Sequence, residues 1–218
     1  IDELYAMVYS HFNFIQQRLE GEIKLKIYNP ETTMHGYESP HSIIELVQDD
    51  MPLIVDSTVM ELNRQGITIH FIAHSGGIWV KRDKNGVLKD FSSKPDPDMR
   101  PEANVFIVID RQFDEPALSA LSEALLKILE DIRLVVNDFH PMKQALNSYI
   151  KHLEQFHPQS KTNKLEESMA FLKWLGEDNF TFLGFAEFTP SSDKKATWTY
   201  DPASTLGLIN TNSTYGLE

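Results

Sequence analysis

Cysteine is absent from the 218 residues, and its absence excludes disulfide bonds and thiolate metal sites. Basic residues are few, because 20 Lys and Arg stand against 32 Asp and Glu, for a net charge of −12. Proteins that hold phosphate backbones need clustered Lys and Arg, so we expect neither nucleic acid nor an anionic membrane surface as a partner. The apolar runs are also far shorter than the ~20 residues of a membrane-spanning helix.

Glycine-rich phosphate loops are missing as well. The sequence contains no Gly-x-x-x-x-Gly-Lys-Ser/Thr and no Gly-x-Ser-x-Gly stretch, which are the signatures of a P-loop and of a hydrolase nucleophile. A nicotinamide site needs glycine backbone at a strand-to-helix turn, but the turn with the strongest signals, residues 49–53, has no glycine. We therefore predict that this chain has no catalytic residue, no cofactor-binding residue and no metal site.

Apolar residues make up 41% of the chain, which is enough for a packed core. Their spacing alternates between the period of strands and that of helices. The first expected elements are a helix over 2–19, strands over 23–30 and 42–48, a helix from Pro52 to Gly66, and a strand over 67–83 bent at Ser75-Gly76-Gly77. A hairpin turn at Asn85-Gly86 follows, and we expect the charged residues 81–84 at its solvated tip. The later elements are a central strand over 103–111, helices over 114–139, 142–156 and 165–175, and a strand over 180–188. This order predicts an α+β fold, a ferredoxin-like antiparallel sheet backed by helices.

Two adjacent carboxylates, Asp49 and Asp50, lie between a strand and a helix. They could form an acid/base pair, bind a metal, or start the helix. Pro52 suits the first turn of a helix, which puts one of the two aspartates at or next to the N-cap, where a carboxylate accepts free N–H groups. We interpret the pair as an acidic cap, and we expect Asp56 and Glu61 on the exposed side of the helix that follows.

The eight histidines raise the possibility of a metal site. His70 and His74 lie about 13 Å apart on one strand, too far for both to bind one zinc ion at about 2 Å. His35 and His41 share a loop and could meet Asp49. We expect ordinary surface or half-buried histidines at all of these positions.

Four stretches carry a family resemblance. Residues 24–74 include "IIELVQDDMPLIVDSTVMELNRQG", and "VKRDKNG" (80–86), "FIVIDR" (106–111) and "FLKWLGEDNFTFLGFAEF" (171–188) follow. Together they resemble the N-terminal region of the large, bacterial-type NAD-specific glutamate dehydrogenases over roughly 23–188. The Asp-Asp-Met-Pro block is its most specific part.

The resemblance implies a much longer parent enzyme. Such an enzyme converts L-glutamate, NAD and water to 2-oxoglutarate, ammonium and NADH in the cytoplasm, as a homo-oligomer, and NAD binds to domains downstream of this region. The family's N-terminal region resembles tandem ACT modules, which are small regulatory α+β domains. The implied domains are an N-terminal helix (1–22), an ACT-like domain (23–140), a helical connector (141–164) and the beginning of a second ACT-like module (165–218). Both chain ends look cut, so we expect a piece of a longer protein.

ACT modules often bind amino acids where the first strand meets the first helix, at an Asp-x-Pro-Gly turn. The implied effector-binding residues are Asp49, Asp50, Met51, Pro52 and Leu53, and Leu53 occupies the glycine place and crowds the site. We therefore expect a non-catalytic role in regulation or assembly. Its partners are the downstream domains of the same chain and further copies of it. An amino-acid-sensing module and a pure oligomerisation module that pairs strand edges stay open as alternatives.

Overall fold

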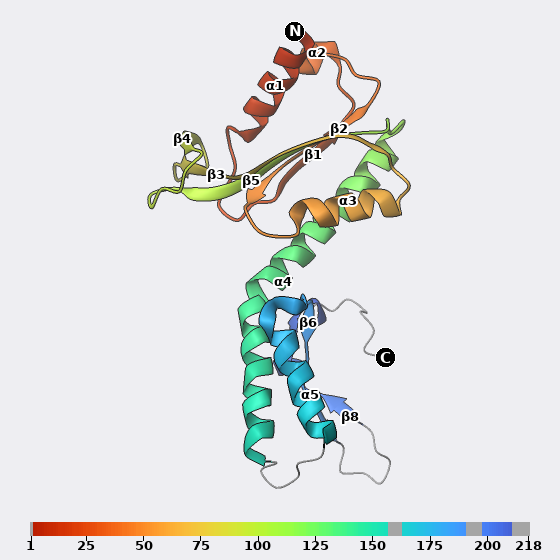
Figure 1. The fold of residues 1–218 in the computed structure, drawn as a ribbon. Coiled ribbons are helices and arrows are strands. Elements are labelled where there is room, and N and C mark those ends of the chain that lie inside the picture. The colour runs from red at the N-terminus through yellow and green to blue at the C-terminus, as the bar shows by residue number, and fades with distance from the viewer. Residues whose placement is uncertain (1, 157–162, 191–197, 211–218) are drawn as a thin grey trace. The chain divides into compact units, whose positions relative to one another are not determined.

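The computed structural model describes residues 2–156, 163–190 and 198–210 (Figure 1). The chain divides into two compact units, Ile1–Glu130 and Asp131–Glu218, which we call unit 1 and unit 2. Of the helices in the described residues, none combines the length and the apolar character that crossing a membrane requires. The domain limits implied by the resemblance stay a prediction.

Unit 1 is built on one five-stranded sheet in which every neighbouring pair is antiparallel. The strands, in spatial order, are β1 (Lys24–Tyr28), β2 (Ser42–Asp49), β5 (Arg100–Ile109), β3 (Ile69–Arg82) and β4 (Leu88–Ser92). Strands β2 and β3 are joined through a helix and have β5 between them, which is the split βαβ arrangement of ferredoxin-like folds. The predicted α+β fold is confirmed, and so is the central place of the strand ending at Ile109.

Helices cover both faces of this sheet. The helices that begin in unit 1 are α1 (Asp2–Ile15), α2 (Thr32–His35), α3 (Ile54–Arg64) and α4 (Glu115–Phe156). Figure 1 shows α1 on one face of the sheet and α3 with the first part of α4 on the opposite face. Because of this double cover, β2 is buried at seven of its eight positions.

The two faces differ in chemistry. The face under α3 and α4 is apolar, with a core made of Ile44, Leu46, Leu62, Val105, Ile107, Leu121 and Leu125. The face under α1 carries a small apolar cluster of Tyr28, Ile43 and Phe106, against which Met7 packs. It also holds the buried polar residues Glu45, Glu102 and Asn104. Helix α1 therefore lies on a surface of mixed polarity, and its position depends on polar contacts.

The bend predicted in the third strand is confirmed. The register between β3 and β5 shifts between Ser75 and Ile78, which is where the two glycines lie. At Gly77 an added Cβ would come within 2.6 Å of the Asp50 carboxylate. The bend thus leaves room for the turn that follows β2.

The hairpin at Asn85-Gly86 also forms, and Gly86 has the positive φ of +80° that such a turn needs. The connection between β3 and β4 is longer than two residues, because the Asp83 carboxylate organises it. One carboxylate oxygen of Asp83 accepts backbone N–H groups of Asn85 (2.9 Å) and Val87 (3.1 Å).

Two local predictions are wrong. A new helix was expected after Pro141, but α4 runs through this proline without ending. Met142 and Ile150 beyond the proline are buried, and such packing stabilises a helix although proline donates no backbone hydrogen bond. Glu61 was expected to be exposed, but its side chain is buried. Arg64 covers it with two contacts of 2.7 Å and lowers the pKa of the Glu61 carboxyl by hydrogen bonding.

Unit 2 combines the rest of α4 with α5 (Asn163–Trp174) and two small sheets. The sheets pair β6 (Gly184–Phe185) with β9 (Leu206–Gly207) and β7 (Phe188–Pro190) with β8 (Trp198–Tyr200). One long strand was expected over 180–188, whereas the structure has the two short strands β6 and β7 there. Residues 191–197 and 211–218 of the expected second module lie outside the described residues.

Candidate functional site

The turn predicted as the site connects β2 to α3. Asp49 is the last residue of β2, and α3 begins at Ile54. Between them the Asp50 backbone N–H donates to the Pro101 carbonyl at 3.1 Å. The strand–turn–helix interpretation of this stretch is therefore confirmed.

The acidic cap is wrong. The N-cap residue of α3 is Leu53, and no side chain caps the helix there. The Asp49 carboxylate instead accepts a hydrogen bond from the Arg18 guanidinium. A full positive charge binds a carboxylate more strongly than the partial charge of a helix terminus does, so Asp49 turns toward Arg18.

Leu53 adopts a left-handed backbone conformation, with φ of 74° and ψ of −6°. A non-glycine residue in this region costs roughly 1–2 kcal/mol, and Leu53 is one of two such residues in the described chain. Its carbonyl accepts the Ser57 N–H at 3.0 Å and so starts the helix. The turn thus keeps a glycine-type backbone while its side chain is leucine and half-buried.

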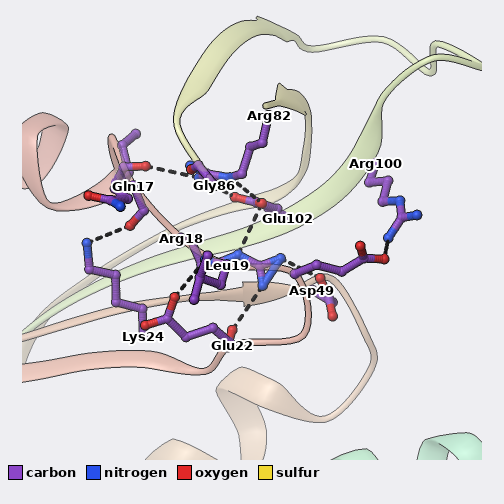
Figure 2. Close-up of polar contacts among 12 residues, drawn as sticks. Gln17, Arg18, Leu19, Glu22, Lys24, Asp49, Arg82, Gly86, Arg100 and Glu102 are labelled. Carbon is purple, nitrogen blue, oxygen red and sulfur yellow. Dashed lines mark hydrogen bonds and ion pairs between the residues drawn. The ribbon is translucent and has the colours of Figure 1, made fainter. Parts of the chain in front are cut away.

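Next to this turn lies an arginine–glutamate cluster, made of Arg18, Asp49, Arg82 and Glu102 (Figure 2). Glu102 is at its centre, and its side chain is only 3% exposed. Arg18 Nε donates to Oε1 at 3.1 Å, and Arg82 donates to both oxygens, at 2.7 Å from Nε and 2.8 Å from Nη2. Each buried charge is therefore paired, as a stable buried ion cluster requires.

The same arginines bind backbone carbonyls of neighbouring segments. Arg82 donates to Gly86 at 2.9 Å and to Ile15 at 3.0 Å, and Arg18 donates through Nη1 to Glu22 at 2.9 Å. The Arg18 backbone N–H also donates to the Gly86 carbonyl at 3.0 Å. Because a Cβ at Gly86 would lie 2.3 Å from the Arg18 carbonyl oxygen, this contact requires glycine.

The end of α1 is held by cations. Lys24 Nζ donates to the carbonyls of Phe14 (2.5 Å) and Gln17 (2.7 Å), and Arg82 binds that of Ile15. Positive charge at a helix C-terminus is stabilising because the last carbonyls carry partial negative charge. Burial lowers the pKa of the Lys24 amine, whereas the charge of Glu22 raises it. The contact of Lys24 with the end of α1 therefore depends on groups that favour its charged form.

The cluster lines a cavity of about 350 Å³ together with charged side chains that include Glu20, Lys84 and Arg100. Asp49 is the one predicted site residue in this lining. Arginine does not give up its proton in proteins, and Glu102 is held by two arginines. The arrangement therefore suits the holding of chain segments and does not suit proton transfer.

The histidines are not gathered around Asp49. His35 stacks on Tyr28, and His41 lies against His70, with ring centroids 4.1 Å apart. His70 in turn contacts the Asp110 carboxylate at 2.8 Å. Within the described parts of the chain, no group of three or more His, Asp or Glu side chains is placed to hold a metal ion.

Sequence reasoning missed the cluster. Arg18 lay inside the predicted first helix, and Glu102 lay just before a predicted strand. Arg82 was expected at a solvated hairpin tip with its charged neighbours, but its side chain is only 12% exposed because it pairs with Glu102. One usable signal was Glu102 itself, a lone carboxylate at the edge of an almost wholly apolar strand, since a buried acid requires a cation.

We predict that Glu102→Gln destabilises unit 1 by about 3–5 kcal/mol, because two arginines then keep buried charges without their shared counter-ion. Urea denaturation followed by tryptophan fluorescence measures the change in the free energy of unfolding. The matched control is Glu20→Gln, which breaks an ion pair with Arg100 whose side chains are 76% and 72% exposed. We expect no measurable change in that variant, and equal effects of the two substitutions contradict the role of the cluster.

We further predict that Leu53→Gly is more stable than Leu53→Ala by about 1 kcal/mol, because glycine adopts the left-handed conformation without strain. At Val55, inside α3, the order reverses, and Val55→Gly is less stable than Val55→Ala by about 1 kcal/mol. Thermal and urea unfolding of the four variants provide the comparison. If the Gly and Ala variants have the same order of stability at both positions, strain at Leu53 is ruled out.

Comparison with known proteins agrees with the resemblance seen in the sequence. An NAD-specific glutamate dehydrogenase of Halomonas elongata is 36% identical over 198 residues, covering 89% of this chain and 12% of the relative. An NAD-specific glutamate dehydrogenase of Pseudomonas aeruginosa is 31% identical over 211 residues, covering 95% of this chain and 13% of the relative. The chain thus spans about an eighth of the length of these curated relatives.

The family model described as the glutamate dehydrogenase ACT1 domain matches residues 1–125. This range contains α1, the whole five-stranded sheet and the start of α4, and it ends close to the limit of unit 1. Since the match covers more than half of the 218 residues, the chain belongs to the glutamate dehydrogenase ACT1 domain family.

Proposed function

We propose that this chain is a regulatory and assembly segment of an NAD-specific glutamate dehydrogenase and has no catalytic activity of its own. The parent enzyme converts L-glutamate, NAD and water to 2-oxoglutarate, ammonium and NADH in the cytoplasm, and NAD binds outside this segment. Its partners are the downstream domains of the same chain and further copies of the chain.

One observation carries the proposal, namely that the family match over residues 1–125 coincides with one compact unit. A unit with its own core can act as a module. Its polar centre consists of carboxylates paired with arginines, and the arginines donate to backbone carbonyls of several segments. Such contacts suit a module that holds neighbouring segments of the chain in place. The edge strands β1 and β4 offer backbone groups for pairing with another copy.

The test is an activity assay on the 218-residue chain. With L-glutamate and NAD we expect no NADH absorbance above the blank, while the Pseudomonas aeruginosa relative forms NADH under the same conditions. Sedimentation velocity of the same sample is expected to show association that increases with concentration. Turnover by the purified chain contradicts the non-catalytic part of the proposal, and a strict monomer at high concentration contradicts the assembly part.

The second candidate function is amino-acid sensing at the turn between β2 and α3. The observation that favours it is Gln48, which is fully buried next to the turn and has neither its oxygen nor its nitrogen hydrogen-bonded within the described chain. A buried amide without partners costs about 1–3 kcal/mol, and an amino acid could satisfy it. The N-terminal amides of α3, which no side chain caps, lie on the same connection.

If the segment senses an amino acid, we expect one of a panel of twenty amino acids to release or absorb heat when it is titrated into the chain. We also expect Gln48→Leu to remove the binding of that amino acid. Because the unpartnered amide is lost, we expect Gln48→Leu to be at least as stable as the parent chain. Asp50→Ala, a substitution in the turn itself, is the second variant and is tested for loss of the same binding. If no amino acid binds in calorimetry, the segment is not a sensor.

A further inference from the structure

A second cavity of about 950 Å³ lies in unit 1, away from the arginine–glutamate cluster. Its walls come from α1, β1, α2 and the start of α4, and Figure 1 shows α2 beside α1. Its lining includes Phe14, Lys26, Met34, His35, Arg111 and Leu118. Carboxylates of Glu31 and Glu115 are also in the lining, so the cavity carries both signs of charge.

The ring of His35 is held in one orientation. It stacks on Tyr28 with 4.3 Å between ring centroids, and the Glu31 backbone N–H donates to its Nδ1 at 3.1 Å. A neutral imidazole has one acceptor nitrogen and one N–H. Since Nδ1 is the acceptor here, Nε2 carries the proton and is a donor.

The group that faces this donor is another donor. Lys26 Nζ lies 3.4 Å from His35 Nε2 and 4.1 Å from the centre of the Tyr28 ring. An ammonium group has no acceptor, so the two N–H groups converge without a hydrogen bond between them. Among the residues that the structure describes, no carboxylate forms an ion pair with Lys26.

The buried acid opposite Lys26 in the sheet uses one of its oxygens elsewhere. Glu45 pairs with Lys26 in the register of β1 and β2, but its Oε1 contacts His11 Nδ1 at 3.0 Å, and its Oε2 has no hydrogen-bond partner within the described chain. Arg111 binds the Ser39 carbonyl at 2.7 Å and adds a further cation to the cavity. Neither Lys26 Nζ nor His35 Nε2 therefore donates to a carboxylate of the residues that the structure describes.

We propose that Lys26 and His35 bind the oxyanion of a small organic molecule, either a carboxylate or a phosphate group. An oxygen placed between Nζ and Nε2 accepts from both, and charge-assisted hydrogen bonds of this kind are about twice as strong as neutral ones. The apolar walls at Phe14, Met34 and Leu118 suit an apolar body attached to the anionic group. This site does not depend on the proposed regulatory role or on the turn at residues 49–53.

Protonation of His35 reports on the site. The groups that face it are the Lys26 ammonium, the Glu31 and Glu45 carboxylates and the Tyr28 ring, and its pKa is lowered, first by burial and then by the charge of Lys26. A bound anion favours the charged imidazolium. Binding at neutral pH should therefore raise the pKa of His35 toward or above its usual value.

The experiment is an NMR titration of the 218-residue chain at constant ionic strength, with inorganic phosphate in one series and acetate in the other. We expect a saturable shift of the His35 Cε1–H resonance, and a higher pKa of His35 in the presence of the anion that binds. A shift with one anion alone identifies the source of the oxyanion, and shifts with both support recognition of the shared charge.

Matched variants separate the site from general charge effects. Lys26→Gln should weaken binding by about tenfold or more, Lys26→Arg should retain it, and Lys94→Gln, an exposed lysine outside this cavity, should leave it unchanged. His70, which contacts Asp110, is the internal reference. The proposal is overturned if neither anion gives a saturable shift, if Lys26→Gln binds like the parent chain, or if His70 responds equally.

Discussion

The pairing of the buried Glu102 carboxylate with two arginines is the interaction on which the arrangement of unit 1 depends. Glu102 lies on β5, Arg82 on β3, and Arg18 in the segment between α1 and β1. One buried charge thus links three parts of the chain that are far apart in sequence. A buried carboxylate without cations is very costly, so these segments must fold together.

The cluster also explains why the sheet is covered on both faces. Helices α3 and α4 pack on the apolar face mainly by burial of aliphatic side chains. On the other face, none of the described α1 side chains is fully buried, and the outward side of α1 exposes Leu4, Tyr5 and Val8. Its attachment comes from the cations that bind its last carbonyls, from the arginine–glutamate cluster and from the contact of His11 with Glu45.

The turn between β2 and α3 combines a glycine-type backbone with a leucine side chain. Its backbone turns through a left-handed residue, which glycine adopts most easily, yet Leu53 stands there. Asp49 is drawn away from the helix terminus by Arg18, and Asp50 takes the room left by Gly77. The Asp-Asp-Met-Pro block therefore matters for chain geometry and for the cluster, which its acidic character alone did not indicate.

Local patterns in the sequence determined the order of the strands and of the longer helices in unit 1, the bend at the two glycines, the hairpin at Gly86 and the family, but not the short helix α2. These features follow from the period of apolar residues and from backbone preferences, which act over a few neighbouring positions. The tertiary structure alone decided that Arg18, Arg82 and Glu102 meet, that Asp49 does not cap α3, that Glu61 is buried under Arg64, and that Lys26 faces His35. In the arginine–glutamate cluster, charged side chains reach partners 20 to 84 residues away, so their pairing depends on strand order and register, which local periodicity does not contain.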